Sequence, residues 1–196
     1  MARSNAALRV ITDPRPRPVL PSAVLGMLMF VGTEVMLFAG LVSAFLILRA
    51  TAAGGWPPPG QPRLPLEETA INTLALLASG FMLWRARRAF SDSPARAQRP
   101  LTIAMLLGAF FVLFQGYEWV MMIRQGLTLT SSNHGSFFYL IVGLHAMHVV
   151  AGLSVLAWAW WRLRSGFLSS SSFAAAQVFW FFVVGLWPVL YFLVYT

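Results

Sequence analysis

Residues 25–40 of the chain read LGMLMFVGTEVMLFAG and contain one ionisable side chain, Glu34. The stretch belongs to an apolar run, 21–50, whose only other charge is Arg49 near its end. An ionisable group at the centre of a membrane-spanning helix costs about 2.5–3.5 kcal/mol on insertion scales. A carboxyl group at that depth is usually paired, protonated or turned towards protein rather than lipid. Glu34 is therefore the first candidate site residue.

The composition around this stretch is that of an integral membrane protein. Of the 196 residues, 58% are hydrophobic and 10% are charged, whereas a soluble domain carries about 25% charged residues. The net charge of +8 does not indicate nucleic-acid binding, because the 14 basic residues, all arginine, cluster between the apolar runs. Cysteine is absent, which excludes disulfides and thiolate metal sites.

Five apolar segments predict an all-α integral membrane protein, a bundle of five transmembrane helices. Each is long enough to cross a hydrocarbon core of about 30 Å at about 1.5 Å per residue. The expected spans are about 20–50, 66–89, 100–124, 136–162 and 172–196. Residues 1–19 are expected to form a cytoplasmic Arg/Pro-rich tail, and 20–196 a single transmembrane domain.

The distribution of arginines predicts the orientation. Three segments that would lie on one side of the membrane carry eleven arginines, and the other side carries three. Basic residues are enriched in cytoplasmic loops, so the N-terminus is expected in the cytoplasm and the C-terminus outside, in the periplasm. The first group is Arg3, Arg9, Arg15, Arg17, Arg85, Arg87, Arg88, Arg96, Arg99, Arg162 and Arg164; the second is Arg49, Arg63 and Arg124.

Four ionisable residues fall within the expected spans: Glu34, Glu118, His145 and His148. The spacings of His145 with His148, and of Gln115 with Glu118, are i and i+3, so each pair shares a helix face. From the helix rise, Glu118 lies about 10 Å below the outer end of its span, Gln115 and His145 about 15 Å, and His148 about 19 Å. Glu34 lies near the midplane. These depths predict that Glu118 and Gln115 meet His145, and that Glu34 meets His148.

Three roles are open for these groups. They can tie the helices together through buried hydrogen bonds, each contributing about 0.6–2 kcal/mol. Glu34 can serve a proton relay or a functional lipid contact. A metal or haem site is the third role, but two histidines on one helix face cannot bind a haem iron from opposite sides, and a closed zinc site needs more ligands. We therefore predict no metal ligand, no bound cofactor and no catalytic residue in this chain.

Several ordered motifs resemble one family. Residues 33–40, TEVMLFAG, resemble a family pattern Ser-Glu-Val-x-Phe-Phe-x-Gly, with Glu34 at its intramembrane glutamate. Residues 115–119, QGYEW, resemble its Gln-x-x-Glu-Tyr/Trp, and 143–152, GLHAMHVVAG, are the most specific match. The chain resembles cytochrome c oxidase subunit III, the third subunit of haem-copper oxygen reductases, over nearly its whole length from Gly26.

The chain departs from the family pattern in two respects. The long form of the family has seven helices, whereas this chain has five expected spans that begin at the third, as in short bacterial forms. The family's last helix carries Trp-His-Phe-Val-Asp-x-x-Trp, whereas residues 180–187 read WFFVVGLW, so Phe181 and Val184 replace the His and Asp. We therefore expect Glu34 and His148 to have fewer polar partners than in other members.

The resemblance implies an accessory subunit of a respiratory terminal oxidase in the bacterial cytoplasmic membrane. Haem and copper would belong to the catalytic subunit I beside it, and this chain would stabilise that partner, contact phospholipids and carry no redox centre. The complex would reduce oxygen with electrons from cytochrome c or quinol and couple this to proton translocation. Two alternatives stay open: the related accessory subunit of a nitric oxide reductase, and a stand-alone membrane transporter, which more often shows an internal repeat or discontinuous helices.

Overall fold

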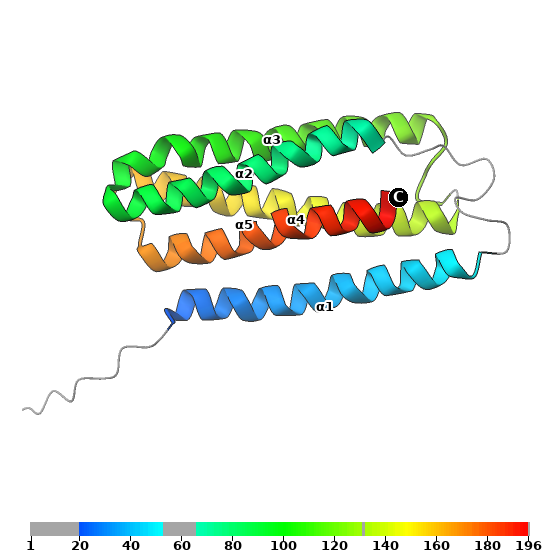
Figure 1. The fold of residues 1–196 in the computed structure, drawn as a ribbon, viewed down its shortest axis with the longest axis horizontal. Coiled ribbons are helices and arrows are strands. Elements are labelled where there is room, and N and C mark those ends of the chain that lie inside the picture. The colour runs from blue at the N-terminus through cyan, green and yellow to red at the C-terminus, as the bar shows by residue number, and fades with distance from the viewer. Residues whose placement is uncertain (1–19, 53–65, 131, 196) are drawn as a thin grey trace, which may run out of the picture.

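Within the residues that the computed structural model describes, 20–52, 66–130 and 132–195, the chain forms helices and no strands (Figure 1). The predicted tail 1–19 and most of the first loop lie outside these ranges. The elements are α1 (Ser22–Ala50), α2 (Leu66–Asp92), α3 (Pro94–Arg124), α4 (Asn133–Arg164), α5 (Ser170–Leu190) and a final π-helical turn, η1 (Tyr191–Tyr195).

Local signals in the sequence explain where most of these helices begin and end. Ser132 and Ser169 precede α4 and α5, and the side chain of each accepts a hydrogen bond from the backbone N–H three residues further along, of Gly135 and Ser172. Gly126 and Gly166 follow α3 and α4 with φ of 94° and 75°, the left-handed region that only glycine enters readily. Ser93 alone separates α2 from α3, and Pro94 occupies the first turn of α3.

Two prolines lie inside helices. The prediction began the third span at residue 100, but α3 begins at Pro94 and continues through Pro100, so a polar extension of one and a half turns precedes the apolar part. Pro188 lies near the end of α5 and cannot donate a backbone hydrogen bond. The chain continues as the π-helical turn η1, a wider turn that is found where the regular ladder is interrupted.

Four of the described helices are long and apolar enough to cross a membrane: Ser22–Ala50, Pro94–Arg124, Asn133–Arg164 and Ser170–Tyr195. They correspond to four of the five expected spans. The second expected span, about 66–89, is indeed one helix, α2, with 27 residues. Its sequence contains more polar residues than the other four, and it does not meet the same criterion of composition.

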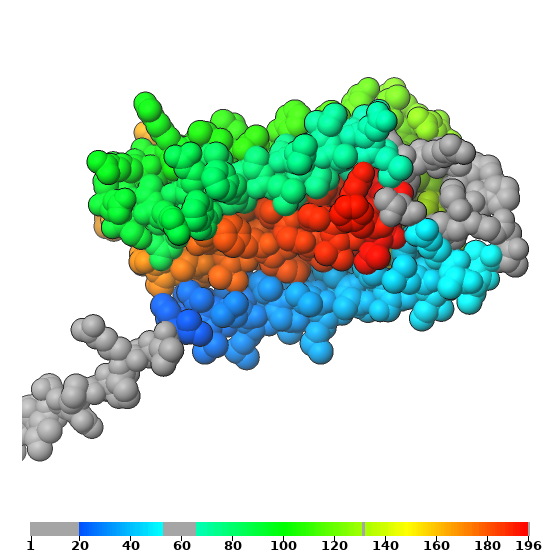
Figure 2. All heavy atoms as spheres, viewed as in Figure 1, coloured from blue at the N-terminus to red at the C-terminus, as the bar shows by residue number. Residues whose placement is uncertain are grey.

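The helices α2–α5 pack into a bundle, and α1 lies on its outside. Helix α2 packs against α3 along its length, α3 against α4, α4 against α5, and α5 against α2. Helix α1 contacts α5 and, over a shorter stretch, α4. Figure 2 shows α1, in blue, lying along the surface of α5, and only Phe38 and Phe45 of α1 are buried.

The interior of the bundle is built around two tryptophans of α5. Trp180 and Trp187 are fully buried, and two glycines give Trp180 its space. A Cβ atom added at Gly108 of α3 or at Gly152 of α4 would lie 2.7 Å from a ring carbon of Trp180. The indole therefore fills the junction of α3, α4 and α5. A side chain larger than glycine at position 108 or 152 would displace it.

We expect Gly108→Ala and Gly152→Ala each to destabilise the purified chain, because the buried indole has no free space to move into. Overpacking of this kind costs about 1–3 kcal/mol. The measurement is thermal unfolding in detergent, followed by circular dichroism. Gly185→Ala is the matched control, since a Cβ there meets nothing within 4 Å. Equal unfolding temperatures for all three variants would contradict this account of the core.

Candidate functional site

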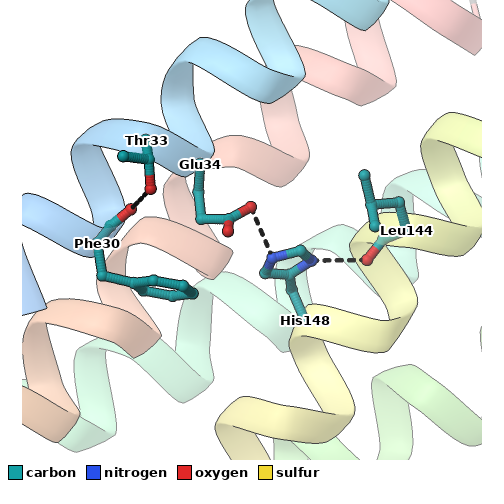
Figure 3. A network of polar contacts seen from close by, with 5 residues as sticks. All are labelled: Phe30, Thr33, Glu34, Leu144 and His148. Carbon is teal, nitrogen blue, oxygen red and sulfur yellow. Dashed lines mark hydrogen bonds and ion pairs between the residues drawn. The ribbon is translucent and has the colours of Figure 1, made fainter.

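Glu34 and His148 form a pair that joins α1 to α4, as their depths predicted. Oε2 of Glu34 lies 3.0 Å from Nε2 of His148, and Figure 3 shows the two side chains pointing at one another from the two helices. The side chains are 15% and 8% exposed, respectively. The contact thus lies inside the protein, although α1 itself is the outermost helix.

The hydrogen-bond geometry limits where the proton of this pair can be. Nδ1 of His148 lies 2.8 Å from the carbonyl oxygen of Leu144, and a carbonyl only accepts, so Nδ1 carries a hydrogen. Nε2 then either accepts a hydrogen bond from a neutral Glu34 carboxyl group or, when it is protonated, donates one to the Glu34 carboxylate. In both arrangements one proton lies between Oε2 and Nε2, and the pair as a whole is neutral. Neutrality suits a site among apolar side chains, where an uncompensated charge is costly.

Aromatic rings enclose the imidazole of His148. The ring of Phe38 from α1 lies 5.5 Å from it, and the rings of Phe182 and Phe179 from α5 lie 6.2 and 6.3 Å away, measured between centroids. These contacts leave the imidazole two polar neighbours, the Leu144 carbonyl and Glu34. The pair therefore ties three helices together: α1 and α4 through the hydrogen bond, and α5 through the rings.

A second polar cluster joins α2, α3 and η1. Gln115 Nε2 donates to Glu118 Oε2 at 2.9 Å and lies 3.1 Å from the hydroxyl of Tyr195. Thr69 Oγ1 donates to the same carboxylate oxygen at 3.1 Å. The shared face of Gln115 and Glu118 was predicted from their spacing. Thr69 and Tyr195 were not predicted, because a hydroxyl group in an apolar run gives no signal of its partner.

The predicted contact of Glu118 and Gln115 with His145 is wrong. His145 stacks on Trp187 of α5, with ring centroids 5.0 Å apart and planes 25° apart, and neither ring nitrogen has a hydrogen-bond partner among the described residues. A cavity of about 110 Å³ lies between α3, α4 and α5, lined by both His145 and Gln115. Depth along a helix does not fix rotation about the helix axis, and the imidazole of His145 is turned to stack on Trp187.

A polar stripe on α2, which the sequence did not predict, accepts hydrogen bonds from the core tryptophans. Trp180 Nε1 donates to Ser79 Oγ at 3.1 Å, and Trp187 Nε1 donates to Thr73 Oγ1 at 2.8 Å. Asn72 Nδ2 donates to the Phe111 carbonyl of α3 at 3.2 Å. The available signal was the spacing of the small polar residues of α2: Asn72 and Thr73 follow Thr69 by three and four residues, and Ser79 follows Asn72 by seven, which places them on one side of the helix.

This arrangement of paired groups on five helices agrees with the comparison to known families. The family model described as cytochrome c oxidase subunit III matches residues 16–196. The chain belongs to the cytochrome c oxidase subunit III family.

Curated relatives in this subunit III family come from distant organisms. A probable cytochrome c oxidase subunit 3 of Mycobacterium leprae is 36% identical over 177 residues, covering 87% of this chain and 85% of the relative. Cytochrome c oxidase subunit 3 of a Synechocystis species is 33% identical over 175 residues, 87% and 73% of the two chains. The rabbit protein is 34% identical over 179 residues, 87% and 67%.

The structure places the two residues at which this subunit III chain departs from the family pattern. Val184 is buried, and its side chain lies against Gly80 of α2, where an added Cβ would be 3.1 Å away. Phe181 is 40% exposed. Neither side chain is polar, so the last helix supplies His148 with aromatic contacts only among the residues described.

The described residues contain no group of three or more His, Cys, Asp and Glu side chains that could hold a metal ion. Glu34 and His148 provide two potential ligands, and both are engaged with one another. His145 faces Trp187. The prediction that this subunit III chain has no metal ligand of its own stays a prediction, which elemental analysis of the purified chain can test.

The Glu34–His148 pair predicts that two substitutions of Glu34 differ strongly in their effect on the stability of the chain. Glu34→Ala should destabilise the chain by about 1–3 kcal/mol, because Nε2 of His148 is left buried without a partner. Glu34→Gln should be nearly neutral, since the amide can donate to Nε2. Thermal unfolding of the purified variants measures both.

A double-mutant cycle with Glu34→Ala and His148→Ala is the control for this prediction. The contact predicts a coupling free energy of about 0.5–3 kcal/mol between the two positions. Strictly additive effects would show that the pair does not form.

Proposed function

We propose that this subunit III chain is a non-catalytic, accessory subunit of a haem-copper terminal oxidase in the bacterial cytoplasmic membrane. It binds beside the catalytic subunit I, which holds the haem and copper, and makes contacts with other oxidase subunits and with phospholipids. Its role is to stabilise the catalytic subunit, and it has no redox centre. The complex carries out aerobic respiration: it reduces oxygen and couples the reaction to proton translocation.

The observation that best supports an accessory role is how the polar residues of the bundle are used. Glu34 and His148 contact one another, and Glu118 contacts Gln115 and Thr69, so these groups join helices rather than converge on a substrate. The cavity beside His145 has about 110 Å³, whereas sites for small molecules and cofactors occupy about 300–1,000 Å³. This small size supports the proposal that the chemistry takes place in a partner subunit.

The burial pattern of α2 supports a fifth transmembrane span. The residues that make its sequence more polar are turned into the bundle: Thr69, Asn72 and Ser79 are fully buried. On the outside, Ile71 and Leu74 are each 66% exposed. Polar side chains that are hydrogen-bonded inside a bundle do not meet lipid, and the remaining surface is apolar. A helix of this kind spans a membrane despite its moderate mean hydropathy.

For Glu34, a structural role is the proposal that its geometry favours. Its carboxyl group is hydrogen-bonded to His148, whose imidazole also contacts the ring of Phe38 on the helix of Glu34. The pair joins α1 to α4, and most of the other contacts of α1 lie on α5. A proton relay would need a chain of further polar groups beyond this pair.

Co-purification tests the proposed function. The full-length chain with an affinity tag, extracted in mild detergent from its own organism, should bring with it a haem-copper catalytic subunit whose absorption spectrum shows haem. Oxygen and nitric oxide consumption by the same preparation identify the substrate of the complex. A homo-oligomer without haem would contradict the proposal and favour a stand-alone transporter.

Membrane topology is a second test. The arginine distribution predicts that the N-terminus is cytoplasmic and that Thr196 lies on the opposite side, as five spans require. A reporter enzyme that is active only outside the cytoplasm should therefore be active when fused after Thr196 and inactive when fused before Met1. Activity of both fusions, or of the N-terminal one alone, would overturn the five-span topology.

A further inference from the structure

The turn between α2 and α3 contains a groove lined by three arginines. The groove, which we call the hairpin groove, has about 340 Å³ and lies between the end of α2 and the beginning of α3. Arg85, Arg96 and Arg99 line it together with the apolar side chains of Met82, Ala89 and Ile103. All three arginines are exposed, so guanidinium groups from two helices surround an apolar floor.

The other arginines at this end of the bundle have partners within the chain. Arg88 lies 4.1 Å above the ring of Trp84, and Arg164 lies 4.9 Å above Trp160. Arg87 donates to Ser170 Oγ at 2.8 Å, and Arg162 lies against the ring of Trp158.

The arginines of the hairpin groove differ in this respect. Among the described residues, no ion pair, hydrogen bond or aromatic contact engages the guanidinium groups of Arg85, Arg96 or Arg99. Three unpaired cations that share one groove repel one another, and an anion placed between them would offset that repulsion. A phosphate group suits the site best, since guanidinium groups bind phosphate oxygens with paired, charge-assisted hydrogen bonds.

A second groove adjoins the first on the other side of Arg99. It has about 350 Å³ and is lined by Gln98, Thr102, Trp160 and Arg164, and it shares Arg99 and Ile103 with the hairpin groove. Arg99 can therefore reach a phosphate in either groove. A ligand with two phosphate groups has a cationic contact available for each.

An apolar stripe runs from the grooves along the outside of α3. Ile103, Leu106, Phe110 and Leu113 are 44%, 64%, 48% and 74% exposed, and their spacing places them on one helix face. At about 1.5 Å per residue, Leu113 lies about 15 Å along the helix from Ile103. That is half of a hydrocarbon core of about 30 Å, the depth that one leaflet occupies.

We propose that the hairpin groove is a binding site for an anionic phospholipid. The phosphodiester lies among Arg85, Arg96 and Arg99, and one acyl chain follows the apolar stripe of α3. A lipid with two phosphodiesters uses the adjoining groove as well and binds more tightly than a lipid with one. The inference rests on the proposed placement of the chain in a membrane, and it makes the general proposal of phospholipid contact specific to one site.

Native mass spectrometry of the purified complex in detergent tests this site. The probes are phosphatidylglycerol, cardiolipin, phosphatidylcholine and glycerol 3-phosphate, which has the phosphate without acyl chains. The test variant combines Arg85→Gln, Arg96→Gln and Arg99→Gln. The matched control combines Arg87→Gln, Arg88→Gln and Arg162→Gln, which removes the same charge at the same end of the bundle from arginines that rest on aromatic rings and line neither groove. If the triple test variant of the groove does not assemble, the single variant Arg96→Gln is measured in its place.

We expect the wild type to retain phosphatidylglycerol about tenfold better than phosphatidylcholine, and cardiolipin better still. The groove variant should lose at least about tenfold in affinity for phosphatidylglycerol, and the control less than about threefold. Equal losses in both variants would overturn the site and indicate an effect of total charge. Binding of glycerol 3-phosphate as tight as that of the lipid would assign the groove to free phosphate compounds instead. The proposed function is tested separately, by whether the haem-copper subunit co-purifies. If it co-purifies with every variant, a loss of lipid binding concerns the groove alone.

Discussion

The structure depends on one constraint: a polar group inside a membrane-spanning bundle must find its partner within the protein. The pair of Glu34 and His148, the cluster of Glu118 with Gln115 and Thr69, and the hydroxyl groups of α2 that accept from Trp180 and Trp187 all satisfy it. Apart from the bond between Gln115 and Glu118, which lies within α3, each of these contacts joins two different helices. The polar residues therefore specify which helices are neighbours. Apolar packing alone specifies this poorly, because the apolar faces of different helices resemble one another and resemble lipid.

The contacts are distributed unevenly over the bundle. Helices α2–α5 share the two buried tryptophans, and glycines at positions 108 and 152 allow α3 and α4 to approach Trp180 closely. Helix α1 takes no part in the packing around these two tryptophans. It is joined to the bundle by the Glu34–His148 pair and by Phe38 and Phe45. The Glu34–His148 contact is thus a directional link to the outermost helix, which explains why an ionisable residue is tolerated in so apolar a sequence.

The two kinds of arginine at the α2–α3 end show how the same residue type can serve packing or recognition. Arg88 and Arg164 cover tryptophan rings, where they shield the end of the apolar core and gain cation–π attraction. Arg85, Arg96 and Arg99 surround a groove instead. In the linear sequence Arg88 lies in the same basic segment as Arg85, Arg96 and Arg99, and Arg164 lies in another segment that also favours cytoplasmic placement. Only the position of the neighbouring aromatic side chains distinguishes Arg88 from the arginines of the groove.

The sequence alone determined the helical class and four spans that the structure bears out. It also contained the motifs of the subunit III family and determined the position of each polar group along its helix axis. The rise of about 1.5 Å per residue fixes height whatever the neighbours are, so Glu34 and His148 could be matched in advance. Tertiary structure decided how each helix is rotated and which helix lies beside it. For that reason His145 stacks on Trp187 rather than meeting Glu118, and the small polar residues of α2 meet tryptophans. Rotation is set by side-chain packing between helices, and a single helix sequence does not contain that information.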